Sequence, residues 1–182
     1  MNDLADTETK FGAKLEPKLK TKLEKKLEVA RPWLVRWMYA VVAVHLLVGL
    51  LLPWIAGLSV FDAYHHTIAR AFWGDAAVTA GYVSATAHAQ QVWWISLFGP
   101  TVQGMSLWMG ALTYIGDRQR ISFAWAWLIA GVVLWAPQDM LISLRADIWI
   151  HVWIDCFAVA TMLPPLVGLY LNDRKPKASV SF

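Results

Sequence analysis

Four long apolar runs dominate this sequence and limit the folds open to it. Each holds at most one charged side chain: Trp33–Leu58, Gln91–Ile115, Ile121–Leu144 and Ile148–Leu171. Apolar stretches of about 18 residues or more are candidate transmembrane helices, because roughly 20 helical residues cross the hydrocarbon core of a bilayer. The 182-residue chain is 58% hydrophobic and 16% charged, whereas soluble domains are about half apolar and a quarter charged. We therefore predict an all-α membrane protein with four transmembrane helices.

The first apolar run is not predicted to be a cleavable signal peptide. It follows a long polar segment, exceeds the length of a signal-peptide core and lacks a small-x-small cleavage site. The single cysteine, Cys156, lies inside the fourth run and has no partner for an intramolecular disulfide or a CxxC motif. We interpret it as a small buried hydrophobic residue.

The distribution of positive charge predicts the orientation of the helices. Fourteen of the sixteen lysines and arginines lie at or before Arg36, between the second and third runs, or after the fourth run. Only Arg70 and Arg145 lie in the other two connections. Because cytoplasmic loops carry an excess of Lys and Arg, both termini are expected in the cytoplasm.

A four-residue repeat, KLEP-KLKT-KLEK-KLEV, occupies Lys14–Val29. Pro17 suits a first helical turn, so we expect the helix to begin there. The leucines then form a slowly winding stripe with lysines beside it. Two interpretations stay open: an interfacial helix held to anionic cytoplasmic lipid, and a solvated helix or partly disordered tail. The predicted division is a basic amphipathic cytoplasmic tail (1–31), a four-span membrane domain from Pro32 (32–171) and a cytoplasmic C-terminal tail (172–182).

Residues 59–90 connect the first two runs on the outer side of the membrane. Four apolar residues are spaced to line one face of a helix: Phe61, Tyr64, Ile68 and Phe72. We expect Gly74 to end this helix and Asp75 to cap a second one that runs through Ala89. We interpret the connection as an amphipathic cover on the outer leaflet, with a free periplasmic loop as the alternative.

Five polar side chains lie inside the predicted spans and form the candidate ligand-binding set: His45, Gln103, Asp139, His151 and Asp155. The last two spans form a hairpin centred near residue 145, so Asp139 should lie level with His151 and contact it. Asp155 lies one turn deeper on the same helix face as His151, because the two are four residues apart. A charged side chain at a helix centre costs about 2.5–3.5 kcal/mol on insertion scales, so such positions are rarely accidental.

Three interpretations of these polar residues compete. The first is structural: a carboxylate–imidazole cluster that joins the third and fourth spans. The second is a binding site, in which the five residues are the polar points of an apolar, tryptophan-lined pocket. The third is catalysis or proton relay, with His151 as acid and base and an aspartate orienting it.

No metal site and no cofactor are predicted. His65 and His66 are adjacent, so their side chains diverge by about 100° on a helix, and His88 completes no zinc-like spacing. Haem ligation by His45 and His151 is disfavoured, because their depths differ by roughly 10 Å. The sequence lacks GxSxG, HExxH, Walker and GxGxxG motifs. Its basic residues lack the interleaved aromatics of a nucleic-acid-binding module.

Four stretches, RAFWGDAA, WWISLFGPTVQ, WAPQDMLISL and HVWIDCFAVATMLPPL, resemble a family of small polytopic inner-membrane proteins of proteobacteria, some of them labelled cell division proteins. The resemblance covers most of the chain from Arg31 onward and excludes the lysine–leucine tail. It implies four spans in a bacterial inner membrane and carries over no catalytic residue.

These features favour an integral inner-membrane protein that is an accessory or lipophilic-ligand-binding component. A polar Asp/His cluster would lie in the outer half of its bilayer. The alternative is a small membrane-embedded enzyme or redox protein acting on a lipophilic substrate. The expected partners are membrane lipids and a larger membrane complex, and no nucleic acid is expected.

Overall fold

The computed structural model describes residues 3–81 and 83–174, with side chains described at residue 22 and from residue 25 onward. Over these residues the chain is helical and contains no strand. Its elements are α1 (Asp3–Ile55), the 3-10 helix η1 (Ser59–Phe61), α2 (Asp62–Trp73), α3 (Asp75–Thr79), α4 (Ala85–Gln119), α5 (Ser122–Arg145) and α6 (Trp149–Asp173).

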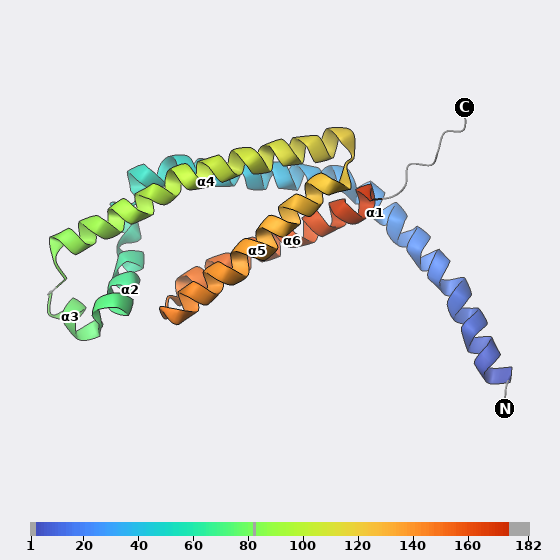
Figure 1. The fold of residues 1–182 in the computed structure, drawn as a ribbon, viewed down its shortest axis with the longest axis horizontal. Coiled ribbons are helices and arrows are strands. Elements are labelled where there is room, and N and C mark those ends of the chain that lie inside the picture. The colour runs from blue at the N-terminus through green and yellow to red at the C-terminus, as the bar shows by residue number, and fades with distance from the viewer. Residues whose placement is uncertain (1–2, 82, 175–182) are drawn as a thin grey trace.

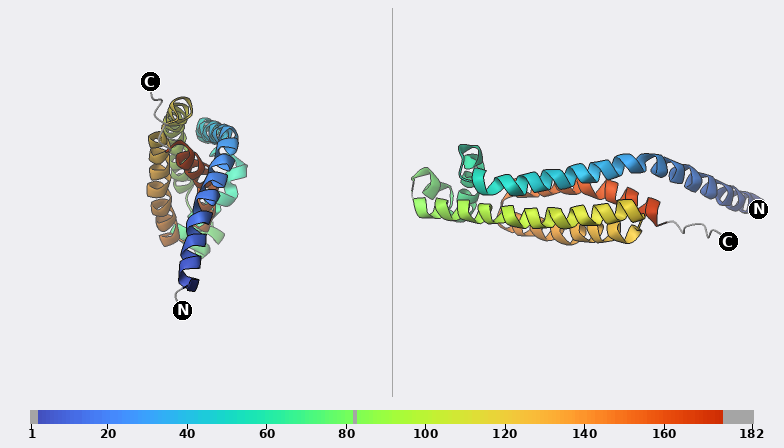
Figure 2. Two further views of the ribbon diagram at one scale, coloured as in Figure 1. Left: turned by 90° about the vertical axis from the view of Figure 1, so that its right-hand side faces the viewer. Right: turned by 90° about the horizontal axis from the view of Figure 1, so that it is seen from above.

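The long helices form two pairs, α1 with α4 and α5 with α6. Further contacts join α1 to α6 and α4 to α5. Figure 1 shows the pairs close together at the end where α6 finishes and spread apart toward the end that carries α2 and α3. The N-terminal part of α1 extends beyond the other helices (Figure 2).

Three helices of the described chain are long and apolar enough to cross a membrane: Lys25–Ile55 within α1, α5 and α6. The 24 residues of α5 give a helix of about 36 Å, and the hydrocarbon core of a bilayer is about 30 Å thick. The predicted second span lies in α4, which is not among the three. Gln103 and several Ser and Thr residues interrupt the apolar run of α4.

α1 is one continuous helix of 53 residues. The expected helix start at Pro17 is therefore wrong, and Pro32 lies inside the helix rather than in its first turn. A proline removes one backbone donor and can bend a helix without ending it. The side chains of Leu15, Leu19 and Leu23 lie outside the described residues, so the lipid-bound N-terminal tail stays a prediction. Lys175 and Lys177 of the C-terminal tail also lie outside the described residues.

The hairpin between the last two spans is confirmed. α5 ends at Arg145 and α6 begins at Trp149, with Asp147 in the left-handed region at φ 57°. The Trp149 indole donates to the Asp147 carboxylate over 2.7 Å. Cys156, expected to be buried, is exposed, because it follows the buried Asp155 and points about 100° away from it around the helix.

The connection between α1 and α4 agrees with the sequence only in its first half. α2 ends at Gly74, which has a φ of 80°, as expected. The second expected helix does begin at Asp75, but its extent through Ala89 is wrong: α3 stops at Thr79, Gly81 turns the chain at φ 71°, and α4 begins at Ala85.

The buried face of α2 also differs from the one expected. Its buried residues are His65 and Ala69, whereas Phe72 is 65% exposed. The helix therefore buries His65 and Ala69 most deeply, while Phe61, Tyr64 and Ile68 of the predicted row are partly buried.

Two prolines in the long helices free carbonyls that a neighbouring helix then satisfies. Pro53 has no N–H for the Gly49 carbonyl, and the Gln103 side chain on α4 donates to that oxygen over 2.9 Å. Pro165 likewise frees the carbonyl of Thr161, to which the Trp37 indole on α1 donates over 2.9 Å. These bonds connect α4 and α6 to α1.

Glycine allows α1 and α4 to approach closely beside the Gln103 bond. A Cβ on Gly49 would lie 2.7 Å from the backbone nitrogen of Gln103, and one on Gly99 would lie 2.5 Å from Pro53. Any larger side chain at either position would push the two helices apart.

The end of the bundle where the pairs converge holds a buried ion-pair network around Arg31. Its guanidinium donates to both carboxylate oxygens of Asp173 over 2.9 and 3.0 Å. It also donates to the Asp117 carboxylate over 3.1 Å. The Trp125 indole donates to Asp173 over 2.9 Å. This Arg31 network (Arg31, Asp117, Trp125 and Asp173) joins α1, α4, α5 and α6.

The network is well shielded from solvent. The side chains of Arg31 and Asp173 are 7% and 1% exposed, and Trp125 is fully buried. Trp125 packs on Gly116, where an added Cβ would lie 2.7 Å from the indole ring. The sequence interpretation counted Arg31 only as a cytoplasmic positive charge and missed this role.

We predict that Arg31→Gln lowers the free energy of unfolding by about 3–5 kcal/mol, because it leaves the buried Asp173 carboxylate without a counter-charge. Unfolding of the purified protein in mixed detergent micelles measures the change. Arg120→Gln is the matched control, since the Arg120–Glu28 pair is about half exposed at 52% and 49% and should contribute about 0–1 kcal/mol. Equal losses in both variants would contradict the network's role.

Candidate functional site

Side chains from α2, α5 and α6 meet at the end where the helix pairs spread apart. The Tyr64 hydroxyl on α2 lies 2.6 Å from Nε2 of His151 at the start of α6. Ser143 near the end of α5 places its hydroxyl 3.4 Å from Nδ1 of the same ring. The Tyr64 and His151 rings stack with their centroids 5.6 Å apart. Both nitrogens of His151 therefore have hydroxyl partners.

Asp155 lies one turn further along α6 and is 3% exposed. The titratable side chains near it are those of Asp139 and His151. Oδ2 of Asp155 is buried without a hydrogen-bond partner. A buried polar group without a partner is costly, so this oxygen marks a position where a donor is lacking.

The expected contact between Asp139 and His151 is absent. Among the described residues, no hydrogen bond or ion pair connects the two, and the half-buried Asp139 carboxylate acts only through its charge. Burial, followed by the charge of Asp139, raises the pKa of Tyr64 to about 12. The phenol is therefore neutral at ordinary pH and can donate to His151. We call Tyr64, Asp139, Ser143, His151 and Asp155 the hairpin cluster.

Two of the five predicted residues have other roles. Nδ1 of His45 donates to the Val41 carbonyl of its own helix over 2.8 Å. Gln103 is bonded to the carbonyl freed by Pro53. The structure thus brings Asp139, His151 and Asp155 together. It adds Tyr64 and Ser143, which sequence reasoning missed.

Both ring nitrogens of His151 face hydroxyl groups, so haem ligation by this residue would require one of these contacts to break. In the described part of the chain, no group of three or more His, Cys, Asp or Glu side chains is placed to hold a metal ion.

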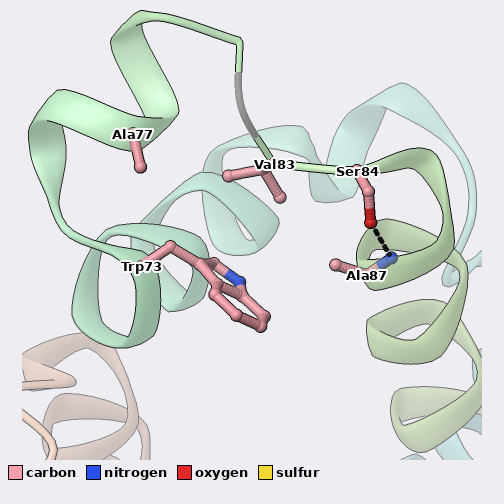
Figure 3. A pocket seen from close by; sticks show the side chains of 5 residues that line it. All are labelled: Trp73, Ala77, Val83, Ser84 and Ala87. Atoms are coloured by element: carbon pink, nitrogen blue, oxygen red, sulfur yellow. Dashed lines mark hydrogen bonds between the residues drawn. The ribbon is translucent and has the colours of Figure 1, made fainter.

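A shallow hollow of about 160 Å³ lies beside α3, between the end of α2 and the start of α4 (Figure 3). Its lining residues are Trp73, Ala77, Val83, Ser84 and Ala87. The Ser84 hydroxyl accepts the backbone N–H of Ala87 over 3.1 Å and caps α4. The lining has no ionisable group and includes none of the predicted site residues, so it offers no chemistry.

The hairpin cluster combines two carboxylates with an imidazole and two hydroxyls. Such a set accepts hydrogen bonds from a ligand more readily than it donates them, because an ionised carboxylate only accepts. Its chemistry suits a bound group that carries a donor or a positive charge. No protein-family model, curated protein or solved structure matches this chain.

Tyr64 provides a pH-dependent test of the cluster. Its folded-state pKa of about 12 lies above the ordinary value of 10.0. The neutral phenol therefore stabilises the fold fully below about pH 10, and this stabilisation is lost as the pH rises through 12. We predict that the ultraviolet phenolate titration of the wild type has a late step whose amplitude falls by one phenolate in Tyr64→Phe. Tyr114→Phe, at an exposed tyrosine, should leave that amplitude unchanged, and a late step of unchanged amplitude in Tyr64→Phe would refute the assignment.

Proposed function

We propose that this chain is an integral membrane protein that crosses an inner membrane four times, with both termini in the cytoplasm. It binds a lipophilic ligand whose polar head contacts the hairpin cluster. In this proposal it is an accessory or binding component rather than a stand-alone enzyme. The helical architecture, with three span-like helices, supports the first part, and the unpartnered Asp155 carboxylate supports the second.

The proposed fourth crossing is α4, and its pairing with α1 supports this. Arg31 meets Asp117 near one end of the α1 span, and Gln103 meets Gly49 near the other. Between these two contacts, Val42 of α1 packs against Gly110 of α4, where an added Cβ would lie 3.3 Å from the Val42 side chain. A helix that accompanies α1 over this length has to cross the same layer that α1 crosses. The 35 residues of α4 make it about 52 Å long, which is sufficient.

The topology predicts that, after Arg120 and after Asp173, a reporter that works only in the cytoplasm is active and one that works only in the periplasm is inactive. A reporter at Asp75 should be active only as a periplasmic fusion, because the α4 crossing places residues 59–84 on the opposite side from both termini. Paired cytoplasmic and periplasmic reporters at each position measure this. A periplasmic signal after Arg120 would overturn the α4 crossing.

Asp155 is the observation that carries the ligand proposal. The carboxylate is buried within a helix apolar enough to span a membrane, and no donor in the described structure reaches its Oδ2. Keeping such a group costs folding free energy. Polar groups retained at that cost are typical of binding sites. The two carboxylates favour a ligand head that donates hydrogen bonds or is cationic, attached to an apolar body that the surrounding helices can hold.

We predict that Asp155→Asn loses a bound amphiphile while the protein stays folded. Native mass spectrometry of protein purified in mild detergent, followed by analysis of the extracted lipids, measures the stoichiometry. The wild type should retain about one specific amphiphile per chain. Asp147→Asn, in the turn between α5 and α6, is the matched control, because Asn tolerates the positive φ of that position.

Two outcomes would refute the ligand proposal. One is a wild-type protein that carries only the bulk lipid mixture. The other is an Asp155→Asn variant that retains the same amphiphile at the same stoichiometry. Thermal unfolding of each variant separates lost binding from lost folding: removal of an unpartnered buried charge should leave stability unchanged or raise it.

A further inference from the structure

His65 on α2 has one engaged ring nitrogen and one buried nitrogen without a partner. Its Nε2 lies 2.7 Å from the Ala56 carbonyl just after α1. A carbonyl only accepts, so Nε2 carries the proton in this bond. In the neutral ring, Nδ1 then holds a lone pair. That nitrogen is buried without a hydrogen-bond partner, and the whole residue is 4% exposed.

The His88 ring from the first turn of α4 lies beside the His65 ring. The two ring centroids are 4.8 Å apart, with the planes at 71°. At a metal–nitrogen distance of about 2.0–2.1 Å, two imidazoles on one tetrahedral ion have centroids roughly 5 Å apart. The observed separation is therefore that of two rings able to share an ion.

We propose that His65 and His88 together bind a transition-metal ion that prefers imidazole ligands, of the Cu(II) or Zn(II) class. The hydrogen bond from Nε2 to the Ala56 carbonyl orients the His65 ring and leaves Nδ1 as the ligand atom. Metal-binding histidines commonly donate their other N–H to a carbonyl or carboxylate in this way. His88 is exposed and supplies the second nitrogen from the open side.

The site is an open one. Two imidazoles leave the other coordination positions to water, since no third His, Cys, Asp or Glu is placed to complete it in the described chain. Water-filled positions make the ion exchangeable and leave room for an added ligand. The bound ion would also connect α2 directly to α4. His66, the neighbour of His65, is exposed and points about 100° away around α2, so it is not a ligand.

Titration of the full-length protein in detergent with Cu²⁺ and, separately, with Zn²⁺ tests this site. The variants are His88→Gln and the matched control His66→Gln. We expect about one high-affinity ion per chain in the wild type and in His66→Gln. Affinity should fall at least tenfold in His88→Gln, because one of the two protein ligands is gone. The Cu²⁺ electron paramagnetic resonance spectrum should show two coupled nitrogens in the wild type and fewer in His88→Gln.

Thermal unfolding gives a second measurement that does not depend on counting ions. A ligand that binds only the folded state stabilises it by an amount that grows with its concentration. Zn²⁺ should raise the Tm of the wild type and of His66→Gln, and a chelator should reverse the rise. The Tm of His88→Gln should respond much less. Equal affinities and equal Tm responses in all three proteins, or no binding to the wild type, would overturn the proposal.

Discussion

The bidentate pair between Arg31 and Asp173 fixes one end of the bundle. Both side chains are almost fully buried, where a charge separated from its partner is costly to hold. Asp117 and Trp125 add α4 and α5 to the same network. The convergence of the helix pairs in Figure 1 therefore has a specific cause at this end. At the other end the connection between the pairs depends on α2.

The polar side chains among the long helices divide into those with partners and those without. Gln103 and Trp37 donate to carbonyls that prolines have freed, so each compensates for a local break in a helix. Arg31 is neutralised by two carboxylates. Oδ2 of Asp155 and Nδ1 of His65 have no such partner, and neither do Oγ1 of Thr113 and Oδ1 of Asn172. Lack of a partner alone therefore does not mark a binding group. Asp155 stands out because it is an ionisable carboxylate, and His65 because the His88 ring lies beside it.

The sequence predicted the elements that depend on one segment at a time. The apolar runs located the long helices, and the four-residue spacing placed His151 and Asp155 on one face of α6. The connection after Gly74 was predicted less well, because Gly81 breaks a pattern that apolar spacing alone extends.

Contacts between distant segments could not be predicted in the same way. Equal distance from a hairpin centre sets the depth of Asp139 but not the rotation of α5 about its axis, so the contact with His151 does not form. Tyr64 is separated from His151 by 87 residues, and nothing in the spacing of α2 shows which helix it reaches. Arg31 is likewise far along the chain from its partners, 86 residues from Asp117 and 142 from Asp173, and the three converge only in the folded structure.

α2 supplies one side chain to each of the two candidate sites at the spread end. Adjacent residues on a helix point about 100° apart, so Tyr64 reaches His151 on α6 while His65 reaches the carbonyl of Ala56. α2 has 12 residues and buries only two of them, so these two hydrogen bonds largely determine where it lies. A segment held by so few contacts opens more easily than a packed core. The end held by α2 is therefore expected to open to a ligand more easily than the end held by the buried pair of Arg31 and Asp173.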